Sequence, residues 1–272
     1  MIVLFTGDHI RHNYLVDSFS KTFSEITWII EKRENYMPNI DRNYCVEINK
    51  LQKIHFEKRL EAEKKFFKSD AGDFSKNKVI QIIKINRKDI SNGKLKKIIS
   101  KIKIKLFITY GVGKIPKKIL KDLNCYKWNI HGGLSPWYRG AITHFWPSYL
   151  LEPEFTGMTL HELTEDIDGG SIIHQNISKL NVKDGIHQNA CRTVKSFFDD
   201  LPSLVKKGFR NRKKLVGINS NTHGRIWTSR MWSPIHLKLI YKVYEDKINK
   251  YCVENKTIIK PKIKSVLVGK NQ

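Results

Sequence analysis

The stretch "CYKWNIHGGLSPWYRG", from Cys125 to Gly140, begins as a strand-like run and then changes to amide, imidazole, glycine and arginine side chains. Two apolar runs end in the same abrupt way: "MIVLFTG" (residues 1–7) leads into "DHIRH", and "KLFITYGVG" (residues 105–113) leads into "KIP". Short apolar runs of this kind are typical of buried parallel strands. Because such sheets bind ligands at the carboxyl ends of their strands, we expect the three loops to form one site.

Strands and helical segments alternate through the first half of the chain. Further strands are expected at "ITWII" (residues 26–30) and "VIQIIKI" (residues 79–85), and helices at residues 12–23 and 51–67. This alternation predicts an α/β protein with a Rossmann-like, mostly parallel sheet and helices on both faces.

The second half of the chain departs from this alternation. We expect a helix over residues 141–151, an antiparallel strand pair at residues 155–163 and 171–177, and a helix over residues 186–201. A last helix is expected to open at Ser233 and Pro234, an N-cap residue followed by a proline at the first helical position. We therefore divide the chain into a domain of residues 1–180 and a mainly helical C-terminal extension of residues 181–272.

Composition limits the possible partners. The 272 residues have a formal net charge of +24, which favours polyanions, and nucleic acid is the first partner it suggests. The lysines, however, are spread along the whole chain without a basic cluster or a nucleic-acid-binding module, so we do not expect nucleic-acid binding. The four cysteines lack metal-site spacing. No apolar run is long enough to cross a membrane and no secretory signal is present, so we expect a cytoplasmic protein without a metal.

The candidate chemistry lies where the fifth strand ends. Asn129 and His131 are two positions apart, so both side chains are expected on the same side of the sheet edge. Asp168, in "EDIDGGSII", is the carboxylate nearest the start of the next strand. Carboxamide, imidazole and carboxylate together are suited to acyl transfer, in which the amide stabilises an oxyanion and the imidazole moves protons. The alternatives are a histidine buried in the core for His131 and a turn cap for Asp168.

Other polar residues near these three are expected to have supporting roles. Arg139 is expected to tie its loop together through backbone carbonyls. His144, His161 and His174 lie in apolar patterns and are expected to pack near the site or support it rather than act on a substrate.

The blocks "NIHGGLSPWYRGAITHFW" and "TGMTLHELTEDIDGGSII" together resemble the signature of the formyltransferases that use 10-formyltetrahydrofolate. This family includes methionyl-tRNA formyltransferase, glycinamide ribonucleotide transformylase and the N-formyltransferases of nucleotide-linked amino sugars. Asn129, His131 and Asp168 match its three catalytic positions. Ser135 departs from the pattern, because many members have leucine before the proline. The resemblance implies an N-formyltransferase with residues 1–180 as its catalytic domain and 10-formyltetrahydrofolate as the formyl donor.

The resemblance also implies two sets of binding residues. "YGVGKIP" is similar to the segment whose backbone binds the pterin, and with the turn before Asp168 it gives the expected folate-binding residues: Tyr110, Gly111, Val112, Ile115, Leu163, Thr164, Glu165 and Asp166. "TGDHIRH" is similar to the loop that holds the amine substrate, often through a phosphate, and gives the expected acceptor-binding residues: Gly7, Asp8, Arg11 and His12.

The tail favours one branch of the family. The transfer-RNA enzymes carry a C-terminal β-barrel and the purine enzymes end early, whereas the helical tail expected here resembles the sugar-formylating branch. We therefore expect formyl transfer to the amine of an amino sugar, nucleotide-linked, in surface-glycan biosynthesis. The alternatives are a methionyl-tRNA formyltransferase-like enzyme and a catalytically idle folate- or RNA-binding module. The amphipathic final helix serves either the core or a homodimer interface.

Overall fold

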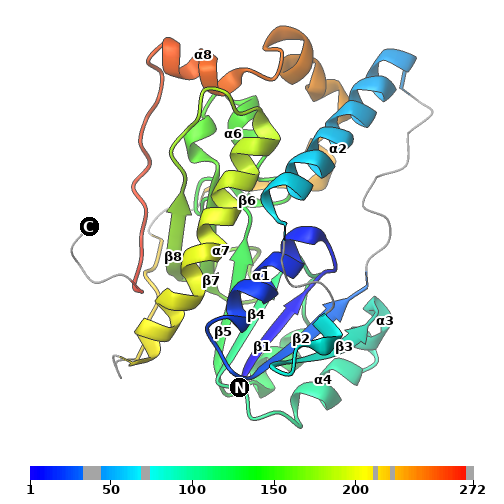
Figure 1. The fold of residues 1–272 in the computed structure, drawn as a ribbon, viewed down its shortest axis with the longest axis vertical. Coiled ribbons are helices and arrows are strands. Elements are labelled where there is room, and N and C mark those ends of the chain that lie inside the picture. The colour runs from blue at the N-terminus through cyan, green and yellow to red at the C-terminus, as the bar shows by residue number, and fades with distance from the viewer. Residues whose placement is uncertain (33–43, 69–73, 211–213, 221–223, 268–272) are drawn as a thin grey trace.

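A computed structural model of the chain describes residues 1–32, 44–68, 74–210, 214–220 and 224–267. Within them, a central sheet of seven strands has the order β3-β2-β1-β4-β5-β7-β8 (Figure 1). The first five of these strands are parallel, whereas β7 and β8 are antiparallel to their neighbours. The bounds are β1 Ile2–Thr6, β2 Ile26–Glu31, β3 Ile80–Ile85, β4 Leu106–Tyr110, β5 Tyr126–His131, β7 Gly157–Glu162 and β8 Ile172–Ile177.

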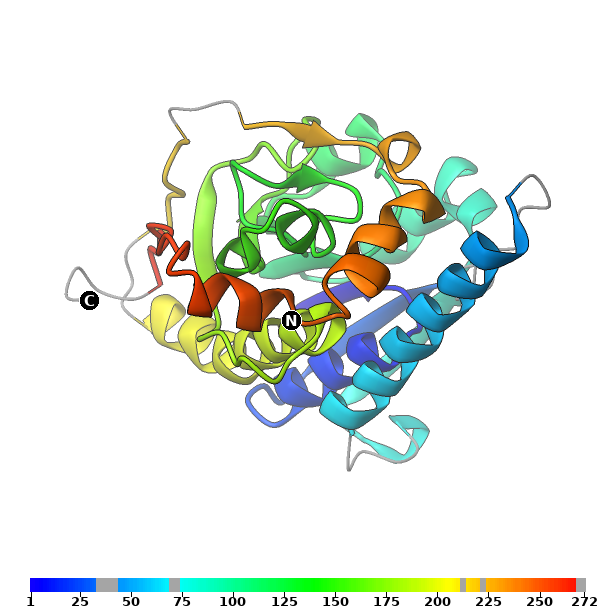
Figure 2. The ribbon, with the colours of Figure 1, turned by 90° about the horizontal axis from the view of Figure 1, so that it is seen from above.

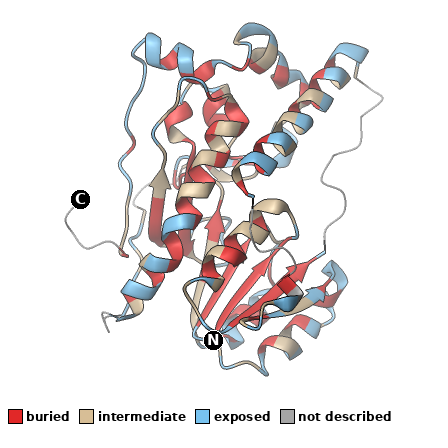
Figure 3. Cartoon of the chain, viewed as in Figure 1, coloured by how far each residue is buried: buried red, intermediate tan, exposed pale blue. Residues whose placement is uncertain are grey.

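Helices cover both faces of the sheet, and the strands are buried between them (Figure 3). Along β1 the side chains alternate: Leu4 packs with α1, α7 and the end of α2, whereas Val3 and Phe5 pack with α3, α4 and α5. The predicted fold class is confirmed. The bounds of these helices are α1 Ile10–Ser20, α2 Val46–Phe66, α3 Arg87–Ser91, α4 Lys94–Ile99, α5 Lys117–Asp122 and α7 Ile186–Arg210; a 3-10 turn, η1, spans Phe74–Lys76.

The strand order places the loops of interest together. The chain winds from β1 outward through β2 to β3, and then returns to the other side of β1 to form β4 and β5. The carboxyl ends of β1, β4 and β5 lie at one edge of the sheet because these strands are parallel. The reversal beside β1 is the place where open α/β sheets hold their ligands.

The helix expected over residues 141–151 is wrong. After β5 the chain forms the short strand β6 (Arg139–Gly140), and only Trp146–Tyr149 is helical (α6), followed by a 3-10 turn, η2, at Pro153–Phe155. Ile142 has a φ of 58°, in the left-handed region that a helix excludes. Pro147 is accommodated only in the first turn of a helix, so α6 begins just before it.

The single helix expected from Ser233 is also wrong. This part of the chain forms the 3-10 turns η3 (Ser229–Met231) and η4 (Pro234–His236), the π-helical turn η5 (Leu239–Val243) and helix α8 (Ile248–Glu254). Glu245 and Asp246 separate η5 from α8, with φ angles of 50° and 61°. The break is held in place because the Asp246 carboxylate accepts hydrogen bonds from the Ile186 amide at 3.0 Å and from Lys58 Nζ at 2.8 Å.

Residues beyond 180 pack against the sheet and the site loops. α7 is part of the core on one face of the sheet. Strand β9 (Ile226–Trp227) pairs with β6, and Trp227 packs with Tyr138 and Trp146 in a separate aromatic cluster. The last described residues run beside β8 (Figure 1), where the Val266 amide donates to the Ile173 carbonyl at 2.8 Å. The division at residue 180 stays a prediction.

In the described part of the chain, no helix is both long enough and apolar enough to span a membrane.

Candidate active site

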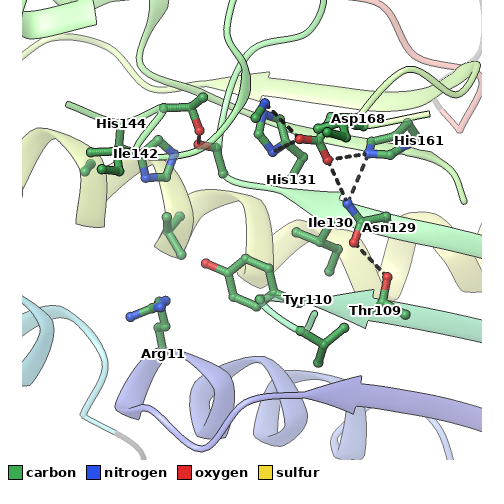
Figure 4. A pocket seen from close by; sticks show the side chains of 18 of the residues that line it. Arg11, Thr109, Tyr110, Asn129, Ile130, His131, Ile142, His144, His161 and Asp168 are labelled. Carbon is green, nitrogen blue, oxygen red and sulfur yellow. Dashed lines mark hydrogen bonds and ion pairs between the residues drawn. The ribbon is translucent and has the colours of Figure 1, made fainter. Parts of the chain in front are cut away.

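The Asp168 carboxylate is the centre of a hydrogen-bonded cluster at the carboxyl end of β5 (Figure 4). Its Oδ1 lies 3.2 Å from Asn129 Nδ2 and 3.4 Å from His161 Nε2. Its Oδ2 lies 3.2 Å from His131 Nδ1 and accepts the Gly140 amide at 2.9 Å. The structure thus brings together Asn129 and His131, as their spacing along β5 predicted, and places Asp168 against both.

The Asn129 carboxamide is fixed in one orientation. Its Nδ2 group donates to Asp168 and to His161 Nε2, the latter at 3.1 Å, and its Oδ1 accepts from Thr109 Oγ1 at 2.7 Å. His161 Nε2 is the acceptor because His161 Nδ1 donates to the Glu162 carbonyl at 2.8 Å. Both N–H groups of Asn129 are therefore directed by this cluster, and His161 supports the site as expected.

His131 is buried, with 6% of its surface exposed, between two hydrogen-bond acceptors. Its Nε2 lies 2.7 Å from the Tyr138 carbonyl and its Nδ1 faces Asp168. Burial lowers the pKa of His131, against the opposing influence of the Asp168 charge, so the resting imidazole is neutral. A neutral imidazole donates to only one of these acceptors, whereas an imidazolium donates to both. The surroundings of His131 therefore suit a proton acceptor.

The charge of Asp168 is stable in this setting. Burial alone would raise its pKa, but the facing His131 imidazole and the hydrogen bond from the Gly140 amide outweigh burial and lower the pKa to about 2. Asp168 is thus a carboxylate at neutral pH and stabilises positive charge on His131. The turn that carries it is held by Arg139, whose Nε and Nη2 donate to the Ile167 carbonyl at 3.0 and 2.6 Å, as expected from the sequence.

A pocket of about 620 Å³ opens beside this cluster. Its volume is within the usual range for small-molecule sites. All eight residues expected to bind folate line it: Tyr110, Gly111, Val112, Ile115, Leu163, Thr164, Glu165 and Asp166. Their role stays a prediction.

The residues expected to hold the amine substrate separate into two groups. Arg11 lines the pocket, whereas Gly7, Asp8 and His12 are absent from its lining. Asp8 is exposed. His12 is buried beneath the loops: a Cβ on Gly7 would lie 2.8 Å from its ring, and the Tyr110 ring is 4.9 Å away, centroid to centroid. His12 therefore packs under both loops rather than facing the pocket.

Sequence reasoning missed the helical wall of the pocket. His55, Arg59 and Glu63 on α2 and His187 on α7 all line it. The Glu63 carboxylate accepts from Arg11 Nη1 at 2.8 Å and from Arg59 Nε at 3.2 Å. The only signal available in the sequence was the spacing of four between His55, Arg59 and Glu63, which places them on one helix face.

The fold and the cluster together define a class of protein. It is an α/β protein with a hydrogen-bonded cluster of carboxamide, imidazole and carboxylate at the carboxyl ends of its parallel strands. The polar groups of the cluster converge on a concave site large enough for a small molecule.

Comparison with known proteins gives the family. A family model described as formyl transferase matches residues 50–195, more than half of the chain. The chain therefore belongs to the formyl transferase family, which confirms the resemblance inferred from its motifs.

Two curated relatives illustrate the sequence similarity. The bifunctional polymyxin resistance protein ArnA of Wigglesworthia glossinidia brevipalpis is 38% identical over 99 residues, which are 36% of this chain and 15% of the relative. Methionyl-tRNA formyltransferase of Prochlorococcus marinus (strain MIT 9312) is 32% identical over 121 residues, which are 43% of this chain and 34% of the relative. The matched region is thus a minor part of each relative.

Two solved structures share the fold. WlaRD, a sugar 3N-formyltransferase crystallised in the presence of dTDP and 5-N-formyl-THF, superposes with a TM-score of 0.57 at 17% identity, covering 90% of this chain and 81% of WlaRD. An N-formyltransferase from Helicobacter canadensis, in complex with folinic acid and dTDP-3-aminofucose, superposes with a TM-score of 0.52 at 17% identity, covering 90% and 82%. At this identity the likeness shows the fold.

Proposed function

We propose that this protein transfers a formyl group from 10-formyltetrahydrofolate to the amine of an amino sugar, with nucleotide-linked sugars as the first candidates. The observation that carries the proposal is the Asp168-centred cluster, which holds Asn129 and His131 at the edge of the pocket. Family membership supports the reaction type. Surface-glycan biosynthesis is the corresponding biological setting, and the catalytic unit is the part of the chain before residue 180.

The pocket end beside the cluster has a suitable composition for the donor. A pterin ring presents N–H groups along one edge, and Glu165, Asp166 and the backbone of the two loops provide acceptors at this end of the pocket. Leu163, Val112 and Ile115 add apolar walls. The bound donor supplies the formyl carbon that the acceptor amine attacks.

Each catalytic residue then has a separate task. Asn129 donates a hydrogen bond to the formyl oxygen as negative charge develops there, and for this one of its N–H groups turns from Asp168 or His161. His131 receives the proton that the amine loses, and the Asp168 carboxylate stabilises the resulting imidazolium. The contact between His131 Nδ1 and Asp168 Oδ2, at 3.2 Å, supports these proposed roles.

One observation favours an amino sugar over a transfer RNA. Of the two structural neighbours described above, one is a sugar 3N-formyltransferase crystallised in the presence of dTDP, and the other is an N-formyltransferase in complex with dTDP-3-aminofucose. The sequence relatives named methionyl-tRNA formyltransferase keep that reaction as the second candidate.

The test is direct. The purified protein is incubated with 10-formyltetrahydrofolate and a panel of amino sugars that includes dTDP-3-aminofucose, and formyl addition is followed by mass spectrometry. Methionyl-tRNA is assayed in parallel. The melting temperature should rise with 5-formyltetrahydrofolate, since a ligand of the native state stabilises it by mass action. Absence of any rise at about 1 mM ligand would contradict folate binding, and formylation of methionyl-tRNA alone would replace the sugar as substrate.

A further inference from the structure

The two ends of the pocket differ in the charged groups they carry. One end carries Glu165 and Asp166 next to the catalytic Asp168, with Lys114 in the lining and Lys117 Nζ 2.6 Å from Glu165 Oε1, and the other carries Arg11 and Arg59 around Glu63. Figure 4 shows Arg11 on the far side of Tyr110 from Asn129 and Asp168. A pocket with two such ends can hold two different ligands, one at each end. Each end favours the ligand that has the opposite charge or matching hydrogen-bonding groups.

The basic end holds two guanidinium groups around one buried carboxylate. Arg11 and Arg59 both donate to Glu63 Oε1, whose side chain is 4% exposed, so the three groups together carry one net positive charge. The side chains of Arg11 and Arg59 are 16% and 35% exposed. Glu63 fixes the direction of both guanidinium groups, and their charge lies in a partly desolvated wall where an anion is bound most strongly.

The electrostatic influence of these arginines reaches the catalytic side of the pocket. Burial lowers the pKa of His144 to about 4, and the charges of Arg11 and Arg59 also act to lower it. His144 follows the catalytic loop and donates from Nε2 to the Gly157 carbonyl at 3.0 Å. His131, His144 and Arg59 line the same pocket, so a ligand that reaches from His131 to Arg59 stays within one cavity.

A cluster of neutral imidazoles adjoins the basic end. His55 Nδ1 lies 3.0 Å from the Tyr241 hydroxyl and 3.2 Å from His187 Nε2, and the Tyr241 hydroxyl lies 3.4 Å from that same nitrogen. Burial, followed by the Arg59 charge, lowers the pKa of His55 to about 3. His55 and His187 are thus uncharged hydrogen-bonding groups on the pocket wall, oriented by a tyrosine from the C-terminal turn η5. Figure 2 shows the backbone of η5, in orange, near α2.

We propose that Arg11, His55, Arg59, Glu63 and His187, here termed the arginine–histidine subsite, bind the phosphate-bearing, hydroxyl-rich part of the acceptor, and that Tyr241 makes the C-terminal segment a determinant of acceptor choice. The inference rests on the proposed function for its assignment to the acceptor. The two arginines match a phosphate group, and the imidazoles match sugar or ribose hydroxyls. The catalytic residues themselves supply no cation to the pocket at neutral pH.

The first test separates the two ligands by binding alone. Calorimetric titrations use dTDP, dTDP-3-aminofucose and inorganic pyrophosphate as acceptor probes, and 5-formyltetrahydrofolate as the donor probe. Arg59→Gln should weaken all three acceptor probes by at least about tenfold, because it removes a charge-assisted contact, and should change the donor affinity by less than about twofold. Equal affinities of Arg59→Gln and the wild type for dTDP and pyrophosphate would overturn the subsite.

Two further variants serve as controls for this test. Lys53→Gln removes a cation from the same helix, where the lysine is 64% exposed and pairs with Glu57, and should leave every affinity unchanged. Arg59→Lys keeps the charge without the planar fork, so its loss should lie between those of Arg59→Gln and the wild type. Melting temperatures verify that each variant is folded, and a loss shared equally by Lys53→Gln would contradict a local role for Arg59.

Tyr241→Phe tests the contribution of the C-terminal segment. Removal of this one hydroxyl takes away a hydrogen-bond partner that both imidazoles share, so the affinity for dTDP-3-aminofucose should fall by about threefold or more while that for pyrophosphate stays constant. An unchanged affinity for dTDP-3-aminofucose would overturn the role of Tyr241. If Arg59-dependent dTDP binding is present without formyl transfer, the proposed function fails and the subsite stands. If formyl transfer occurs and Arg59→Gln leaves the acceptor KM unchanged, the proposed function stands and the subsite fails.

Discussion

The two ends of the pocket are constructed differently. At the catalytic end, Asn129 and His131 come from one strand, and their polar groups are bound within a cluster around Asp168. At the arginine–histidine subsite, the side chains come from three helices that are distant in sequence, and they meet a tyrosine from the C-terminal segment. The strand edge holds Asn129 and His131 in one geometry. The side chains of the helical wall lie on other elements, so a change among them can alter ligand binding without moving Asn129 and His131.

The contrast also predicts which measured quantity each end of the pocket controls. In the catalytic cluster, Asn129, His131 and His161 lie on paired strands of the sheet, and Asp168 lies in the turn between β7 and β8. The subsite is closed by η5, which is followed by two residues in left-handed backbone conformation. Changes at the catalytic end should therefore act on kcat, and changes at the helical and C-terminal end should act on acceptor affinity and stability.

The largest expected effect is at the proton-transfer pair. His131→Asn and Asp168→Asn should each lower kcat by about 10²- to 10⁴-fold, the span for losing a positioned acid–base group or the charge that supports it. Steady-state assays with a saturating acceptor measure this directly. Because the pKa of His131 is lowered, the imidazole remains neutral, and the wild-type kcat should change little between about pH 7 and 8.

The control for this prediction is Arg11→Ala at the other end of the pocket, which should raise the acceptor KM and nearly preserve kcat. If His131→Asn retained near-normal kcat with every acceptor, the catalytic assignment would be incorrect. The contrast between the two ends would then lose its basis.

The next effect in size concerns the carboxamide. Asn129→Ala should lower kcat by about 10²- to 10³-fold, since one donor to the developing oxyanion is lost. Donor and acceptor binding should change little because this hydrogen bond strengthens only during the reaction. Single-turnover measurements separate the chemical step from binding. A raised KM with an unchanged kcat would instead show that Asn129 only positions the substrates.

The catalytic end was accessible from the sequence because it depends on local rules. Period-two spacing along β5 placed Asn129 and His131 on one side, and an acidic turn before β8 supplied Asp168. The apolar pattern around His161 indicated a supporting position, and the structure pairs it opposite Asn129 in β7. The same rules gave the sheet and its loops.

The helical end was not accessible in the same way. Arg59 and His187 meet only because α2 crosses α7, and no local spacing encodes that crossing. The apolar stripe after Ser233 predicted one helix, yet the buried contacts of Asp246 to α7 and α2 outweigh the helical preference of this segment. Here tertiary packing, rather than periodicity, decides the local structure.

The smallest predicted effect tests whether the C-terminal segment is fastened by Asp246. This carboxylate is 9% exposed and accepts from the Ile186 amide, at the first residue of α7, and from Lys58. Asp246→Ala removes the carboxylate that accepts both hydrogen bonds. The free energy of unfolding should therefore fall by roughly 1–3 kcal/mol, as for a lost helix cap or a buried amide left unpaired. Chemical denaturation measures the change.

Two variants sharpen this last test. Glu245→Ala is the matched control, because Glu245 also has a positive φ but its side chain is 68% exposed, so the loss should stay within about 0.5 kcal/mol. Asp246→Gly removes the same carboxylate yet suits the left-handed backbone, so it should destabilise less than Asp246→Ala. If Asp246→Ala is as stable as the wild type, the turn is held by its apolar neighbours. If it is less stable and the acceptor KM rises while kcat is kept, the turn supports Tyr241 and recognition, and the division of labour between the two ends of the pocket holds.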